Sequence, residues 1–86
     1  MTFRSEAVSD GKRTTLRLSG SVQAEHLDLL ADELEKHGPG TVVDLDEITL
    51  VDLEAIRFLN HCERSGIELR NCPSFVRAWM ALERDR

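Results

Sequence analysis

The chain has 86 residues, of which 41% are hydrophobic, and its eleven basic and sixteen acidic residues give a net charge of −5. A chain of this length folds as one small domain, residues 1–86, with a limited core and no large internal cavity. The acidic balance argues against nonspecific binding to nucleic acid or anionic lipid, because both need a basic surface. No apolar run approaches the roughly 20 residues of a membrane span, so we expect a cytoplasmic protein without direct membrane insertion. Two cysteines, Cys62 and Cys72, allow one disulfide at most, which fits a reducing compartment.

The first two predicted elements form a β-hairpin. Residues 3–9 and 13–19 are joined at Asp10-Gly11, a dipeptide favoured in tight turns between strands. In the second segment the leucines alternate with polar residues. A period of two predicts a strand with one face on a core and the other face in water.

Two further strands are predicted at residues 41–46 and 67–70. In the first of them Val43 and Leu45 share the core face, opposite Val42, Asp44 and Asp46. None of the strands is apolar on both faces. We therefore expect a sheet that is covered on one face only.

Three helical segments lie at residues 23–37, 52–65 and 73–84, and each carries an apolar stripe at about 100° per residue. The first stripe is Ala24, Leu27, Leu30, Ala31 and Leu34. The second is Ala55, Ile56, Phe58, Leu59 and Cys62. The third helix, with Pro73 expected at its first position, has a core stripe of Phe75, Val76, Trp79 and Leu82, with Met80 well round from its centre.

The elements follow the order strand, strand, helix, strand, helix, strand, helix. Residues 13–70 thus form β-α-β-α-β, whose right-handed crossovers place both helices on the same side of neighbouring parallel strands. The first hairpin adds an antiparallel edge. The sequence therefore predicts a small α/β domain with a mixed four-stranded sheet and helices mainly on one face.

Five short motifs occur in a fixed order along the chain: Leu18-x-Gly20, Val42-Val43-Asp44-Leu45, Val51-Asp52-Leu53-Glu54-Ala55-Ile56, Gly66-Ile67-Glu68-Leu69 and Asn71-Cys72-Pro73. Each is degenerate alone. The ordered set resembles the STAS domain, the fold of bacterial anti-sigma factor antagonists, over roughly residues 13–80. The resemblance implies a non-catalytic protein–protein interaction module in bacterial signalling or transcription regulation.

In that family, a serine or threonine at the start of the second crossover helix is phosphorylated by a partner kinase, which is often also the anti-sigma factor. Aligned on Asp52, this chain has Leu53 and Glu54 at the two hydroxyl positions. Glu54 therefore takes the place of the phosphoacceptor. The resemblance then implies a relative that is not switched by phosphorylation at this site.

Asp52 and Glu54 also have plain structural interpretations. Asp52 suits the N-cap of its helix, where a carboxylate accepts hydrogen bonds from backbone N–H groups two or three residues on. An acid at Glu54, in the first turn, gains from the helix dipole. Glu54 is either a dipole-stabilising residue or a permanent partial imitation of phosphoserine, with one negative charge in place of about −1.5 to −2.

The same helix presents a candidate partner surface made of Asp52, Leu53, Glu54, Arg57, His61 and Arg64. An exposed leucine beside arginines would combine an apolar anchor with charge. The alternative is a solvated face on which Glu54 pairs with Arg57 three residues on.

The sequence contains no constellation typical of catalysis, and no cofactor or metal site is predicted. Cys62 belongs to the apolar stripe of its helix while His61 points about 100° away, so the adjacent pair is poorly placed to chelate. Both cysteines are expected to be structural. No glycine-rich phosphate loop or nucleophile elbow occurs.

The resemblance implies a protein partner related to anti-sigma factors or their Ser/Thr kinases. An accessory subunit of an ABC-type membrane transport system, bound to the transporter ATPase, is the alternative, because short free-standing STAS proteins also bind such ATPases. The third helix is apolar over an unusually wide arc. It either fills space that extra elements occupy in longer relatives or forms a homodimer contact.

Overall fold

The computed structural model describes residues 3–38 and 40–85, and within them the elements follow the predicted order. They are β1 (Phe3–Ser9), β2 (Thr14–Val22), a short 3-10 helix η1 (Ala24–His26), α1 (Leu27–His37), β3 (Val42–Val51), α2 (Leu53–Arg64), β4 (Glu68–Arg70) and α3 (Ser74–Arg84). Pro73 is the N-cap of α3 instead of its first helical residue. The predicted α/β class is confirmed.

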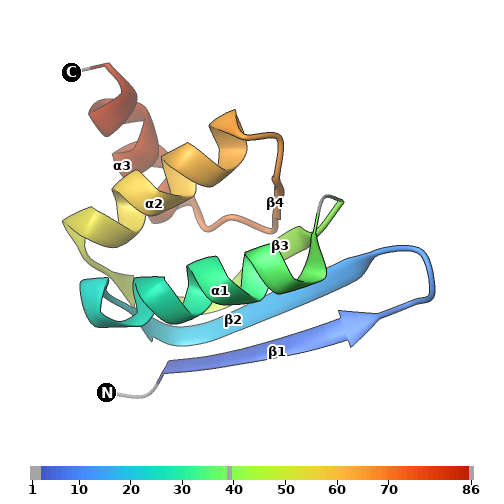
Figure 1. Ribbon diagram of the computed structural model, residues 1–86. Coiled ribbons are helices and arrows are strands. Elements are labelled where there is room, and N and C mark those ends of the chain that lie inside the picture. The colour runs from blue at the N-terminus through green and yellow to red at the C-terminus, as the bar shows by residue number, and fades with distance from the viewer. Residues whose placement is uncertain (1–2, 39, 86) are drawn as a thin grey trace.

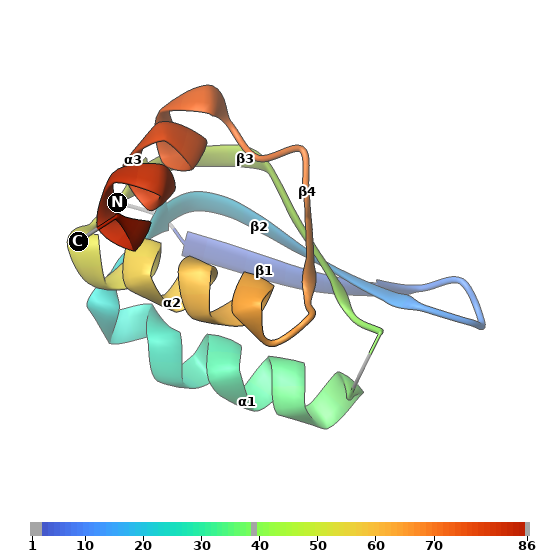
Figure 2. The same ribbon diagram turned by 90° about the horizontal axis from the view of Figure 1, so that it is seen from above.

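The sheet is mixed, with strand order β1-β2-β3-β4. The hairpin β1–β2 is antiparallel, and β3 runs parallel to both β2 and β4. Figure 1 shows α1 in front of the sheet with α2 beside it, and in Figure 2 both helices lie on the same side of the strands. Both views place α2 between α1 and α3 (Figures 1 and 2). The expectation of helices mainly on one face therefore holds.

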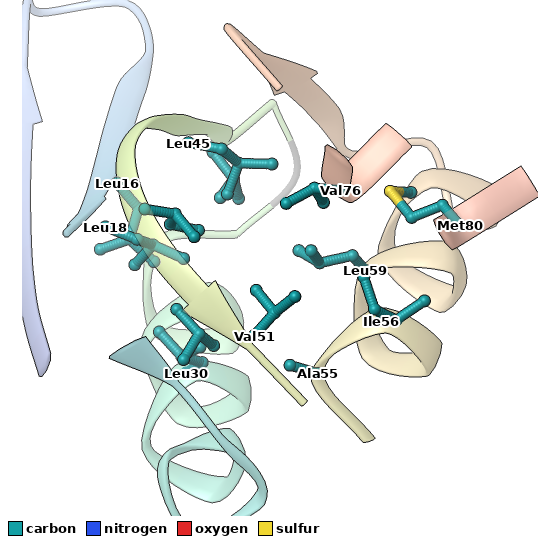
Figure 3. Close-up of a cluster of buried hydrophobic side chains, with 13 residues drawn as sticks. Leu16, Leu18, Leu30, Leu45, Val51, Ala55, Ile56, Leu59, Val76 and Met80 are labelled. Atoms are coloured by element: carbon teal, nitrogen blue, oxygen red, sulfur yellow. The ribbon is translucent and has the colours of Figure 1, made fainter. Parts of the chain in front are cut away.

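The core lies between the sheet and these helices (Figure 3). Leu16, Leu45 and Leu30, from β2, β3 and α1, are at most 1% exposed. From α2 and α3 the core takes Ala55, Ile56, Leu59, Val76 and Met80, all equally buried. A Gly66 with φ of 94° ends α2, because glycine adopts this left-handed conformation without steric cost.

β3 is longer than predicted. It continues past Asp46 to Val51, and its pairing with β2 shifts register on either side of Glu47 and Ile48. An irregularity of this kind changes which face of the sheet the following side chains occupy. Ile48 is therefore buried in the core three residues after Leu45, and the two-residue alternation of buried and exposed positions is lost. The predicted strand, residues 41–46, followed the two-residue alternation and so covers only the first part of β3.

The uncovered face of the sheet is charged, not apolar. Register places Glu6, Arg17, Asp44 and Arg70 in one row across the four strands, with alternating sign. Arg17 contacts Glu6 at 3.9 Å and Glu47 at 3.5 Å. Val42 was predicted on this face and in water, yet it is 1% exposed. It occupies an inner strand with Thr15 and Glu68 as its neighbours on the two sides, which shield it.

The first helical segment begins with a 3-10 turn. Gln23 and His26 form a reciprocal capping box, in which His26 Nδ1 accepts from the Gln23 backbone N–H at 3.2 Å. The His26 ring also stacks on Phe3 with 4.3 Å between centroids. Of the predicted stripe, Ala24 and Ala31 are exposed.

The prediction for α3 was wrong about which residues face inward. Val76 and Met80 are fully buried, whereas Phe75 and Leu82 are 49% and 68% exposed. Trp79 is partly buried against the core. The helix turns its Val76–Met80 side toward α2. The apolar residues of α3 cover a wider arc than this one contact can bury, so those on the far side of the arc remain exposed.

Candidate functional site: the exposed face of α2

The N-terminus of α2 is fixed by Asp52. Its Oδ1 accepts a hydrogen bond from the Ala55 backbone N–H at 2.9 Å, so the predicted N-cap is confirmed. Its Oδ2 accepts from the Ala24 backbone N–H at 2.8 Å, at the start of η1. One carboxylate thus ties together two helix starts that lie 28 residues apart in sequence. The beginning of α2 is held to the rest of the fold.

The predicted partner surface forms one exposed strip along α2, here called the α2 row: Glu54, Arg57, His61 and Arg64. These positions recur at three- and four-residue spacing, which places them on one helix face. Asp52 and Leu53 lie at its N-terminal end, and Leu53 is partly buried where an exposed anchor was predicted. The row opposes the buried stripe of Ala55, Ile56, Leu59 and Cys62.

Arg57 bridges two acids at the N-terminal half of the α2 row. It lies 3.5 Å from Glu54, as the spacing predicts, and its Nε donates to Glu83 of α3 at 3.3 Å. Glu83 keeps only 11% of its side chain exposed. The Glu54–Arg57 pair, exposed at both side chains, contributes only about 0–1 kcal/mol to stability. Together the two contacts hold the Arg57 guanidinium in place between α2 and α3.

The C-terminal half of the row borders a hollow of about 260 Å³ lined by Asn60, Glu63, Arg64 and Arg84. Glu63 contacts Arg77 at 3.0 Å and Arg84 at 3.3 Å, so it joins α2 to α3 by charge. Asn60 is buried, and its Nδ2 donates to the Met80 carbonyl at 3.0 Å. These contacts give the α2 row a rigid support.

The thiols are not arranged for chemistry. Burial raises the pKa of the Cys62 thiol to about 11, and burial is also the main reason that the pKa of Cys72 is raised. Thiolate is the reactive form, so such thiols are poor nucleophiles at neutral pH. Within the described residues, no group of three or more His, Cys, Asp or Glu is arranged to hold a metal ion. None of the helices described there is long and apolar enough to cross a membrane.

The family model described as "Mlab, STAS domain" matches residues 5–84. The chain belongs to the STAS-domain family. A solved structure, "Crystal Structure Analysis of Mglu", superposes on this STAS domain with a TM-score of 0.63 and 18% sequence identity. It covers 80% of the chain, whereas the chain spans only 19% of that protein, so the likeness is one of fold. No curated protein matches the sequence.

STAS domains are typically non-catalytic modules for regulation or protein interaction. In this STAS domain, sequence reasoning found the α2 row but missed Glu83 and Asn60. Glu83 is 26 residues from Arg57, and only the packing of α3 on α2 joins them. A polar residue such as Asn60, next to an apolar stripe, was the available signal for a buried hydrogen bond between helices.

Proposed function

We propose that this STAS domain is a non-catalytic docking module that binds a regulatory protein through the α2 row and the adjoining Asp52 and Leu53. The observation that carries the proposal is a solvent-facing row of one acid, one histidine and two arginines on a helix that Asp52, Glu63 and Asn60 fix to the rest of the fold. Binding to a pre-ordered surface avoids the entropic cost of arranging it.

The STAS resemblance makes a bacterial anti-sigma factor, or the related Ser/Thr kinase, the favoured class of partner. Glu54 stands at the phosphoacceptor position and is 57% exposed. Its single charge is partly balanced by Arg57 at 3.5 Å. We infer that docking here does not depend on phosphorylation at position 54, and that Glu54 favours whichever partner binds the phosphorylated form of ordinary relatives.

An accessory role in a membrane transport system, with an ATPase subunit as partner, is the second candidate. The same missing hydroxyl supports it, because a constitutive subunit needs no phosphorylation switch. The description of the matching family model, "Mlab, STAS domain", does not name an anti-sigma antagonist. Both candidates use the same surface, so the identity of the partner separates them.

Site-specific photo-crosslinking in the native host tests the proposal. A photoreactive residue at His61 in the α2 row should form a discrete adduct with one protein, whereas one at exposed Asp32 on α1 should not. Mass spectrometry of the adduct distinguishes an anti-sigma or kinase relative from a transporter ATPase. Adducts of the same pattern from both positions would contradict docking through α2.

A further inference from the structure

α3 presents a second apolar face, directed away from the helix that it packs against. Phe75 and Leu82 are exposed, and so is Ala78 between them. At about 100° per residue, these three side chains, here called the α3 outer face, lie within about 60° of one another and roughly 150° from Met80. In both views α3 is an outer element with α2 beneath it (Figures 1 and 2).

The α3 outer face is self-complementary. Its three residues have the three- and seven-residue spacing that is typical of a helix–helix seam. In an antiparallel pair about a two-fold axis, Phe75 of one copy meets Leu82 of the other, and Ala78 lies near the axis. A small residue at the crossing allows two helices to approach to about 8–10 Å.

The charges at the two ends of α3 favour that same antiparallel arrangement. Asp85 follows the C-terminus directly, where an acid opposes the dipole of its own helix. The N-terminal turn of α3, all of whose residues the structure describes, contains no acid. No side chain caps this end of the helix. An antiparallel second copy brings each Asp85 to the N-terminus of the other α3, where a negative charge is stabilising.

We infer that α3 is a dimerisation helix and that its occupant is a second copy of this chain. None of the residues of the α2 row belongs to the α3 outer face, so a dimer presents two docking surfaces and gains avidity for a multivalent partner. One pair of 11-residue helices buries less than the roughly 800 Å² per partner of a standard interface, so we expect a dissociation constant on the order of 100 μM.

Sedimentation equilibrium from about 10 μM to about 1 mM spans that constant and tests the inference. The wild type should change from a species of 9.7 kDa to one of twice that mass. Leu82→Glu should raise the dissociation constant at least about tenfold, since it places two charges in the apolar seam. Leu29→Glu is the matched control, because Leu29 is 50% exposed on α1, and it should leave the constant unchanged.

Asp85→Lys tests the orientation of the two helices. It removes an unfavourable dipole interaction within its own helix, so it should not destabilise the monomer, yet it should weaken a dimer about two- to fivefold per contact. A wild type that stays monomeric at every concentration overturns the inference and leaves the α3 outer face to a different protein. Equal loss in Leu82→Glu and Leu29→Glu, with both variants folded by circular dichroism, also overturns it. Neither result bears on docking through the α2 row.

Discussion

Replacement of Asp52 tests how the docking helix is held. Asp52→Ala removes two hydrogen bonds, to the backbone N–H groups of Ala55 at 2.9 Å and Ala24 at 2.8 Å. Loss of an N-cap costs about 0.5–2 kcal/mol, and a further bond to a charged acceptor contributes about 1.5–3 kcal/mol, with partial exposure favouring the lower values. We expect the free energy of unfolding to fall by about 2–3 kcal/mol, which lowers Tm by about 10–20 °C in a domain of this size.

Asp52→Asn separates the two contacts. The amide keeps an oxygen for Ala55 but replaces the second oxygen with an NH₂ group, which cannot accept from Ala24. It should therefore lose about half as much stability as Asp52→Ala. Urea unfolding followed by circular dichroism measures both, with exposed Asp32→Ala on α1 as a control expected within about 0.5 kcal/mol of wild type. If Asp52→Asn matches the wild type, the bridge to η1 contributes nothing, and the reasoning fails.

The other predictions concern three single side chains, Glu54, Cys62 and Asp10. Incubation with ATP and a STAS-directed kinase should leave position 54 unmodified in the wild type but phosphorylated in Glu54→Ser, as mass spectrometry would show. Because Glu54 is exposed, its replacement should lower the free energy of unfolding by at most about 1 kcal/mol. Cys62, with its pKa raised by burial to about 11, should react with a disulfide reagent at pH 8 far more slowly than the partly buried Cys72, and equal rates would contradict its burial. Because that pKa lies above the ordinary thiol value of 9.0, the stability from the neutral Cys62 thiol is complete below about pH 9 and is lost as pH rises through about 11. Hydrogen bonds from the backbone N–H groups of Arg13 and Lys12 lower the pKa of Asp10, so its carboxyl should titrate below 3.8 by NMR, and a value at or above 3.8 would exclude the turn geometry.

Local patterns with a single physical cause predicted much of this structure. The two-residue alternation around Leu16 and Leu18 predicted their burial, because a strand with one covered face allows only one register. Asp52 was predicted as an N-cap from its residue type and position alone. The α2 row was predicted with its exposure because its four residues lie within about 80° of one another, opposite the centre of the apolar stripe of that helix.

The remaining features depend on tertiary contacts that local patterns do not encode. α3 offers apolar residues over so wide an arc that several orientations bury comparable area, and only its contacts with α2 select Met80 over Phe75 and Leu82. β3 regains the core at Ile48 through a change of register with its neighbour, which periodicity cannot show. The second bond of Asp52, to Ala24, likewise joins segments that only the fold brings together.

The affinity of the purified domain for the protein captured through His61 tests docking by α2 most directly. Arg57 lies between Glu54 and Glu83 in the α2 row, and Arg57→Ala removes its charge and its ordered contacts. The account predicts that isothermal titration calorimetry finds Kd raised at least about tenfold, or about 1.4 kcal/mol, with Asp32→Ala within about twofold of wild type. A Kd for Arg57→Ala that equals that of the control would contradict docking through the α2 row.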